Sequence, residues 1–322
     1  MVPTLVVVAS CLAGCGGGSS GPDAAIDTTP TWWQPKVGEA KNWDIQLTAP
    51  IDVSTPRLMY DLDLWALVPS PTMIDYGDGD PVMVPAGALA GTIAYLHAST
   101  PPTIVICHLE TGVLDLSLPD ARKFPGYNAN PAMIPDQTAP AAGSVIGWKV
   151  GVSTKRWLDI REASRDKLVP IMFKRFDLAR QIGCDGVEPD RNLAAEFASL
   201  TGFSPGGFDS YSWFAEIAKQ GHARQLSTGM KNGHAFPDQT DMEADKFDWL
   251  MVERCGEDQL CDHARPFINS MKAVLAIDYD KDITDVAQSS DLVCGEETKF
   301  MIADGIIKDA GLTKNVRMQC SP

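Results

Sequence analysis

The chain has 322 residues, of which 44% are hydrophobic, and its formal net charge at pH 7 is −15. This apolar content is sufficient to bury a sizeable core and argues against a disordered chain. The acidic balance argues against nucleic acid as the main partner, whereas a neutral or cationic ligand fits it better.

The N-terminus carries the pattern of an export signal. Residues 5–12 are mostly apolar but too few to span a bilayer, and small residues and a cysteine follow them. The run Leu12-Ala13-Gly14-Cys15 resembles a bacterial lipobox, in which the cysteine carries lipid after cleavage. We therefore expect a lipoprotein signal peptide in residues 1–14, a flexible tether in 15–30 and one folded domain in 31–322. The mature protein would be exported and either anchored to a membrane through Cys15 or extracellular.

Short apolar runs alternate with helix-like stretches along the rest of the chain, which is typical of an α/β fold. Amphipathic helices are expected before the fifth, sixth and eighth strands, and the irregular residues 66–102 and 113–150 are expected to be loops at one rim. Eight strands can close a (β/α)8 TIM barrel. The candidate strands begin at Trp43, Arg57, Thr103, Arg156, Cys184, Gln225, Phe247 and Lys272.

Nearly every candidate strand begins apolar and ends in acids or amides. The stretch "GCDGVEPD" from residue 183 places Asp185, Glu188 and Asp190 within a segment that otherwise reads as a buried strand. In a (β/α)8 barrel the C-terminal strand ends converge on one mouth, where active sites are built. A ring of acids there, with eight tryptophans in the chain, indicates sugar chemistry, because glycosidic cleavage requires one protonated and one ionised carboxyl group.

The cysteines that remain after export are even in number. Export to an oxidising compartment makes disulfides the expected use of these six residues, although several connectivities are possible. Metal ligation is the alternative, but the sequence contains no CxxC or HxxxH spacing to support it. The pairing that we favour is Cys255 with Cys261 across a short loop, Cys294 with Cys320 at the C-terminal tail, and Cys107 with Cys184 between two strands.

Several segments together resemble a known family. These segments include "WWQPKVGEAKNWDIQL", "VICHLETG", "RWLDIR", "MFKRFDLARQIGCDGVEPD", "GMKN", "FDWLMVERCGEDQLC" and "AIDY". Over about residues 31–280 the chain resembles glycoside hydrolase family 114, the endo-α-1,4-polygalactosaminidases. The resemblance implies a (β/α)8 barrel that cleaves α-1,4-linked galactosamine stretches, and such a cationic substrate suits an acidic protein.

The resemblance also implies site residues. By motif, the catalytic acids would be Asp190 and Glu253, with Glu253 favoured as the proton donor, Asp190 as its ionised partner and Glu188 in reserve. Neighbours of these acids depart from the family pattern, since Arg191 and Arg254 follow them directly. The residues expected to contact substrate are Asp63, Asp159, Arg161, Glu188, Lys231, Asn232, Asp278 and Tyr279.

Three functions of different classes remain open at this point. The favoured one is an exported glycoside hydrolase, expected to act as a monomer on an amino-sugar polysaccharide without a metal or cofactor. The second is a noncatalytic carbohydrate-binding envelope lipoprotein. The third is a structural envelope protein that keeps the barrel and the disulfides but has no affinity for sugar. Appearance of new reducing ends distinguishes the first from the second.

Overall fold

The computed structural model describes residues 30–233, 243–279, 286–302 and 304–320, and Trp32–Pro322 form one compact unit. The expected signal peptide, the tether up to residue 29 and the lipidation site Cys15 lie outside the described residues. Among the described residues, no helix is both long and apolar enough to cross a membrane.

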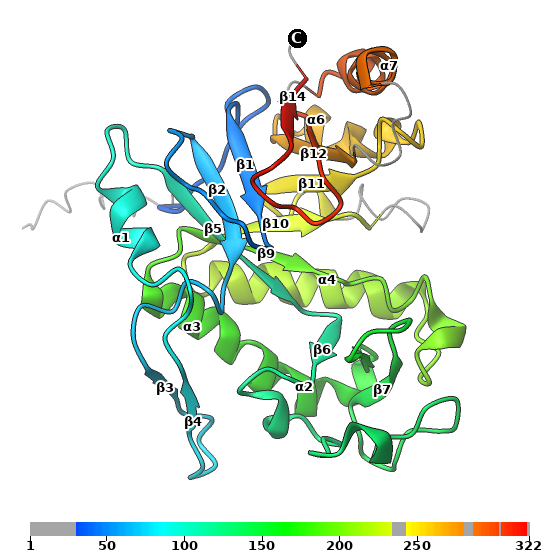
Figure 1. Cartoon of the computed structure of the whole chain (residues 1–322). Helices are drawn as coiled ribbons and strands as arrows, with labels where there is room; N and C mark the ends of the chain where they lie inside the picture. The colour runs from blue at the N-terminus through cyan, green and yellow to red at the C-terminus, as the bar shows by residue number, and fades with distance from the viewer. Residues whose placement is uncertain (1–29, 234–242, 280–285, 303, 321–322) are drawn as a thin grey trace, which may run out of the picture. The chain divides into compact units, whose positions relative to one another are not determined.

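A nine-stranded sheet curls into a nearly closed barrel within the described part of the chain (Figure 1). Its first eight strands are parallel neighbours, and the ninth pairs antiparallel with the eighth. In sheet order they are β1 (Trp43–Gln46), β2 (Met59–Asp63), β5 (Ile104–Glu110), β9 (Gly186–Asp190), β10 (Ser227–Lys231), β11 (Trp249–Glu253), β12 (Val274–Tyr279), β13 (Ile306–Lys308) and β14 (Arg317–Gln319).

The two edges of this sheet meet around β1. The side chain of Arg317 on β14 donates to the carbonyl oxygen of Trp43 at 2.7 Å, and Lys308 Nζ on β13 lies 2.8 Å from Asp44 Oδ1. These contacts close the barrel over an apolar interior, in which inward-facing side chains are almost completely buried. The interior includes Trp43, Ile45, Ile106, Trp249, Met251, Leu275, Ile277 and Ile306.

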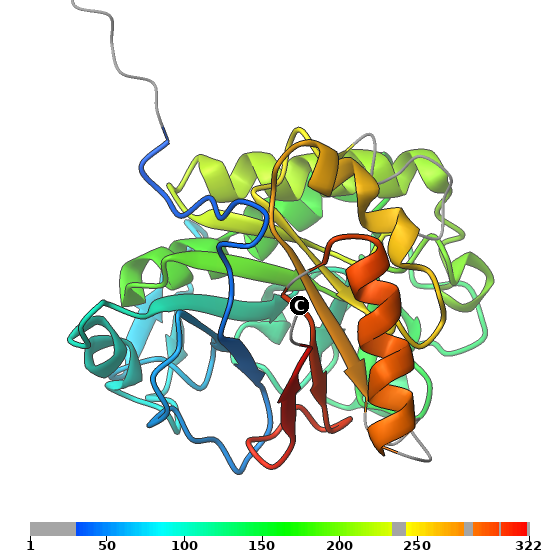
Figure 2. The same cartoon turned by 90° about the horizontal axis from the view of Figure 1, so that it is seen from above.

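Helices cover the outside of the barrel, as the view from above shows (Figure 2). In α4 the buried residues recur with helical spacing, from Trp213 and Phe214 to Ile217 and Gly221, so one face packs on the strands. Gly221 permits a close approach, because a Cβ there would lie 1.9 Å from the hydroxyl of Thr228 on β10. The helices are α1 (Thr92–His97), α2 (Arg165–Met172), α3 (Lys174–Ile182), α4 (Gly207–His222), α6 (Arg265–Asn269) and α7 (Val286–Lys299).

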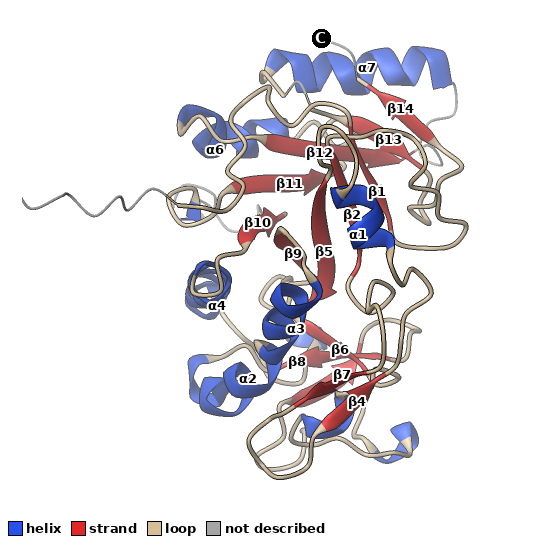
Figure 3. Ribbon diagram, turned by 90° about the vertical axis from the view of Figure 1, so that its left-hand side faces the viewer, coloured by secondary structure: helices blue, strands red, loops and turns tan. Residues whose placement is uncertain are grey.

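One of the eight predicted strands does not belong to the barrel. The segment that begins at Arg156 forms β8 (Lys155–Leu158), which pairs antiparallel with β6 (Val113–Asp115) and β7 (Ile146–Lys149) in a separate sheet (Figure 3). Its partners come from the region expected to be an irregular loop. The eighth barrel strand is instead β13, whose three residues are too short to give a periodic signal.

The other predicted loop, residues 66–102, also contains regular structure. It forms the hairpin of β3 (Thr72–Ile74) and β4 (Val82–Val84), followed by α1. Short 3₁₀ turns complete the described elements at Ala121–Lys123, Pro131–Met133, Glu162–Ser164, Ala198–Leu200 and Cys261–Ala264.

Disulfides join the three expected pairs in the described part of the chain. Cys107 on β5 bonds Cys184, which lies just before β9. Cys255 bonds Cys261 across the loop after β11, and Cys294 on α7 bonds Cys320 after β14. The predicted pairing is therefore present in the fold.

Candidate active site

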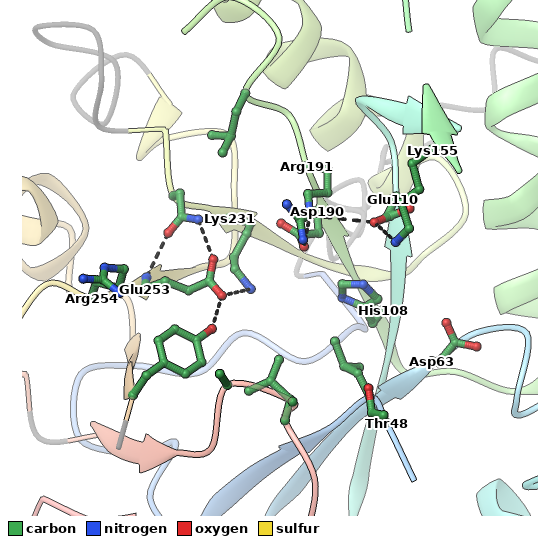
Figure 4. Close-up of a pocket in the computed structure, with 17 residues that line it drawn as sticks. Thr48, Asp63, His108, Glu110, Lys155, Asp190, Arg191, Lys231, Glu253 and Arg254 are labelled. Carbon is green, nitrogen blue, oxygen red and sulfur yellow. Dashed lines mark hydrogen bonds and ion pairs between the residues drawn. The ribbon is translucent and has the colours of Figure 1, made fainter. Parts of the chain in front are cut away.

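A cavity of about 520 Å³ opens at the C-terminal ends of the barrel strands (Figure 4). We call it the mouth cavity. Polar residues from strand ends or the turns that follow make up much of its wall, as expected where parallel strands of a barrel converge. Its lining consists of Leu47, Thr48, Asp63, His108, Glu110, Lys155, Asp190, Arg191, Leu193, Lys231, Asn232, Glu253, Arg254, Tyr279, Ala310, Gly311 and Leu312.

Glu253, the last residue of β11, is held by donors on both of its carboxylate oxygens. The hydroxyl of Tyr279 donates to Oε1, and Asn232 Nδ2 donates to Oε2 at 2.9 Å. Asn232 also accepts from the backbone N–H of Glu253 at 2.8 Å, so the two side chains fix one another. Lys231 Nζ lies 3.9 Å from Oε1. Both oxygens of this carboxyl group therefore accept a hydrogen bond from a neighbouring side chain.

Asp190, the last residue of β9, lines the same cavity beside a different set of charges. Arg191 Nε lies 3.8 Å from Asp190 Oδ2 and 3.8 Å from Glu110 Oε1. Glu110 is itself paired with Lys155 Nζ at 2.5 Å. Figure 4 shows this group apart from Glu253. The mouth cavity is therefore lined by four carboxylates from four different strands, and Asp190 and Glu253 are two of them.

A buried charged layer lies one residue pair deeper in the barrel. It contains Asp61 on β2, His108 on β5 and Glu188 on β9, of which His108 and Glu188 are register partners. Each of the three lies two positions before a residue that lines the mouth cavity, namely Asp63, Glu110 and Asp190. His108 Nδ1 lies 2.5 Å from Glu188 Oε2, and Lys231 Nζ lies 3.0 Å from Glu188 Oε1. Glu188 is completely buried. Alternation along the strands thus places a charge network at the floor of the mouth cavity, which His108 and Lys231 line and below which Asp61 and Glu188 lie.

The protonation of this layer follows from its pairing. Burial alone would lower the pKa of His108, but the charge and hydrogen bond of Glu188 outweigh burial and raise that pKa to about 10. Lys231 behaves alike: burial lowers its pKa, and the charges of Glu188 and Glu253 raise it well above its usual value. Burial raises the pKa of Glu188, yet Lys231 and His108 produce a net lowering. The layer therefore holds two cations around one carboxylate.

Asp61 is the remaining titratable residue of the layer, and its neutral, protonated form is favoured. Burial, and next the charge of Glu188, raise its pKa well above the usual value. Neither of its oxygens has a hydrogen-bond partner among the described residues. Donor atoms of Asp61, His108 and Glu188 lie within 4.8 Å of one another, as metal ligands would. The ammonium of Lys231, 3.0 Å from Glu188 Oε1, brings a positive charge to this cluster.

The residues that directly follow three neighbouring strands share one backbone conformation. Arg191, Asn232 and Arg254 directly follow β9, β10 and β11, and their φ angles are 61°, 52° and 62°. This left-handed region is unfavourable for most residues other than glycine and asparagine, and strained positions of this kind concentrate at functional sites. All three side chains line the mouth cavity.

The structure brings together most, but not all, of the residues predicted from sequence. Those lining the mouth cavity are Asp63, Asp190, Lys231, Asn232, Glu253 and Tyr279. Glu188 lies beneath the cavity. Asp159 and Arg161 lie elsewhere, because β8 is outside the barrel; they pair with each other at 2.7 Å. Asp278 is buried on the opposite face of β12 from Tyr279 and accepts from the backbone N–H of Glu257 at 2.9 Å.

Several cavity residues were not among the residues predicted to contact substrate. Glu110 ends its strand in an acid and could have been found by that signal. Lys155 begins β8, whose position depends on tertiary pairing. Ala310, Gly311 and Leu312 follow β13 and have no chemical signature, yet they form one wall of the cavity.

Comparisons with known proteins agree with this architecture. The crystal structure of Ega3 from Aspergillus fumigatus in complex with galactosamine is similar with a TM-score of 0.68 and 25% identity, covering 89% of this chain and 97% of that one. The glycoside hydrolase domain of PelA from Pseudomonas aeruginosa shares the fold with a TM-score of 0.53 and 13% identity, covering 86% and 98%. A search of curated protein sequences gives no match.

These similarities confirm the (β/α)8 barrel expected from the sequence. The model of glycoside hydrolase family GH114 matches residues 22–321, which is nearly the whole chain. The chain is therefore a glycoside hydrolase and belongs to family GH114.

Proposed function

We propose that this protein is an exported hydrolase that cleaves α-1,4-linked, galactosamine-containing polysaccharide with Asp190 and Glu253 as its catalytic pair. The observation that carries the proposal is that both carboxylates line one cavity at the mouth of a GH114 barrel. The galactosamine complex of the similar Ega3 supports an amino-sugar substrate. A net charge of −15 attracts a cationic polymer over long range.

The contacts of the two acids suggest how they share the chemistry. Glycosidic cleavage needs one acid that protonates the leaving oxygen and one carboxylate that attacks the sugar or activates water. Glu253 accepts hydrogen bonds from Tyr279 and Asn232 on its two oxygens, which suits the ionised role. Asp190 then takes the role of proton donor. This assignment is the reverse of the one favoured from sequence.

Export is part of the proposal. Three disulfides join described cysteines, and such bonds persist in oxidising compartments rather than in the cytosol. The lipobox-like run that ends in Cys15 would anchor the mature protein to a membrane. Mass spectrometry of Cys15 in protein purified from a lipoprotein-processing host tests this anchor, and an unprocessed N-terminus would contradict it.

The function is tested by incubating the purified protein with deacetylated α-1,4-galactosamine polymer and measuring new reducing ends. We expect Glu253→Gln and Asp190→Asn each to reduce turnover by about 10³-fold with unchanged folding. Glu162→Gln, an exposed acid outside the mouth cavity, is the matched control and should retain activity. Binding of polymer without any release of reducing ends would favour the noncatalytic alternative.

The roles are separated with a substrate that carries an activated aryl leaving group. Such a leaving group departs without protonation, so Asp190→Asn should recover much of its activity on it. Glu253→Gln should remain inactive on the same substrate. The opposite pattern would restore Glu253 as proton donor.

A further inference from the structure

A second cavity of about 650 Å³ adjoins the mouth cavity. Arg191 and Leu193 line both of them, so the two cavities lie side by side. The second cavity differs in having mainly apolar side chains, and we call it the aromatic groove. Those side chains are Trp148, Val150, Trp157, Leu193, Phe197 and Leu200.

The aromatic rings of the groove are held in place before any ligand binds. Trp148 donates from Nε1 to the carbonyl oxygen of Thr138 at 2.6 Å. Phe197 stacks on Trp157 with ring centroids 5.7 Å apart and an interplanar angle of 29°. Phe197 is nevertheless 42% exposed and Leu200 is 57% exposed. Flat, fixed and exposed apolar surface is suited to the apolar face of a sugar ring.

The charges of the groove differ from those of the mouth cavity. Lys149 and Arg191 bring two positive charges to it. Asp136 is the acid in its lining, and that carboxylate lies 3.8 Å from the guanidinium of Arg156 and accepts from the backbone N–H of Lys149 at 3.1 Å. An ammonium group on a sugar would meet net positive charge here. A neutral acetamido group, with its methyl, would meet apolar surface.

We propose that the aromatic groove binds N-acetylated hexosamine residues of the same polysaccharide chain that the mouth cavity cleaves at a deacetylated stretch. This inference rests on the proposed function and adds a substrate pattern to it. The occupant is a continuation of the substrate, because the groove and the mouth cavity share Arg191 and Leu193. The protein therefore selects polymer of mixed acetylation.

The first test compares kcat/KM on two substrates. Phe197→Ala should lower kcat/KM by roughly tenfold on long, partly N-acetylated galactosamine polymer, mainly through KM. The same variant should stay within about twofold of the parent on short, fully deacetylated oligosaccharides, which do not reach the groove. Phe208→Ala removes an equally large ring that is 68% exposed on α4 and should change neither value. An equal loss on both substrates would overturn the proposal.

The second test reverses the charge of the groove. Lys149 is exposed, so Lys149→Glu should fold normally. The added acid should shift the preference of the enzyme toward fully deacetylated polymer by severalfold. An unchanged ratio of the two kcat/KM values would contradict the predicted role of charge.

The third test is independent of turnover. Protein with Glu253→Gln should bind N-acetylgalactosamine oligosaccharides in calorimetry, and adding Phe197→Ala should weaken that binding by roughly tenfold. If no galactosamine polymer is cleaved, the proposed function is wrong. This binding measurement still tests whether the aromatic groove binds N-acetylated sugar. Binding that Phe197→Ala does not weaken would show that sugar is not the occupant. The same conclusion would follow if light scattering showed a dimer of the parent protein that Phe197→Ala dissociates.

Discussion

His108 and Glu188 are register partners on the paired strands β5 and β9, and His108 Nδ1 lies 2.5 Å from Glu188 Oε2. Lys231 contacts the other oxygen of Glu188 and approaches Glu253 on its far side. One completely buried carboxylate thus positions two cations, His108 and Lys231, that line the mouth cavity. Glu188 is a positioning residue in this arrangement, and its loss should disturb groups that face substrate.

The charge balance of the buried layer predicts the titration of His108. Its folded pKa of about 10 lies above the ordinary 6.5, so its stabilising effect is full below pH 6.5 and disappears as pH rises through about 10. Glu188→Gln should lower the pKa of His108, because it removes the charge and hydrogen bond that do most to raise it against burial. NMR titration of the ring measures this, with Glu162→Gln as control. A His108 pKa that stays near 10 in Glu188→Gln would exclude Glu188 as the cause.

Glu188→Gln should also cost stability and activity. Breaking a buried ion pair leaves uncompensated charge and typically costs about 3–5 kcal/mol. We expect that loss in urea unfolding at pH 7, together with a lower kcat. A variant as stable as the parent would show that Lys231 and His108 do not depend on Glu188.

The hydrogen bond from Tyr279 to Glu253 predicts a kinetic effect. Tyr279→Phe keeps the ring but removes the donor to Oε1, so kcat should fall by roughly 10–100-fold, since a hydrogen bond to a charged group contributes about 1.5–3 kcal/mol. Melting temperature should change little. Tyr95→Phe, at a 59% exposed position, is the control and should retain full kcat. Equal kcat for parent and Tyr279→Phe would remove Tyr279 from the catalytic arrangement.

The disulfides should differ in their contribution to stability according to the loop each closes. Cys107–Cys184 spans 77 residues and Cys255–Cys261 spans 6. Loop-closure entropy predicts about 4.5 kcal/mol for the first and about 2 kcal/mol for the second. Replacing each pair by alanine and measuring the free energy of unfolding tests this order. A larger loss for the short loop would contradict the entropic account.

A buried acid near the C-terminus predicts a pH dependence of stability. Burial, and next the charge of Asp278, raise the pKa of Glu297 from its usual 4.5 to about 10. Because that pKa is higher in the folded protein, stability is full below about pH 4.5 and falls as pH rises toward 10. Glu297→Gln should raise the melting temperature at pH 9 by roughly 5 °C and change it less at pH 5. Glu296→Gln is the neighbouring control, and an identical pH dependence in Glu297→Gln and the parent would rule out Glu297 as its source.

The barrel strands could be predicted where the apolar pattern of a segment matches its burial in the folded barrel. Seven of the eight predicted strands lie in it, because buried parallel strands are apolar runs that end in polar residues at the mouth. Asp190 and Glu253 could be placed at the mouth from sequence because each ends such a run within a family motif, and both line the cavity. The strand at Arg156 was misplaced because its sequence does not specify its pairing partners.

Sequence alone determined the residue types, their alternation along each strand and the family resemblance. Because side chains alternate, it also places Glu188 on the same strand face as Asp190 and Asp278 opposite Tyr279. Only the tertiary structure decided depth and neighbours: Glu188 lies one layer below Asp190, and Lys231 connects it to Glu253. Register between distant strands sets those distances, and register depends on the packing of the whole barrel rather than on any one segment.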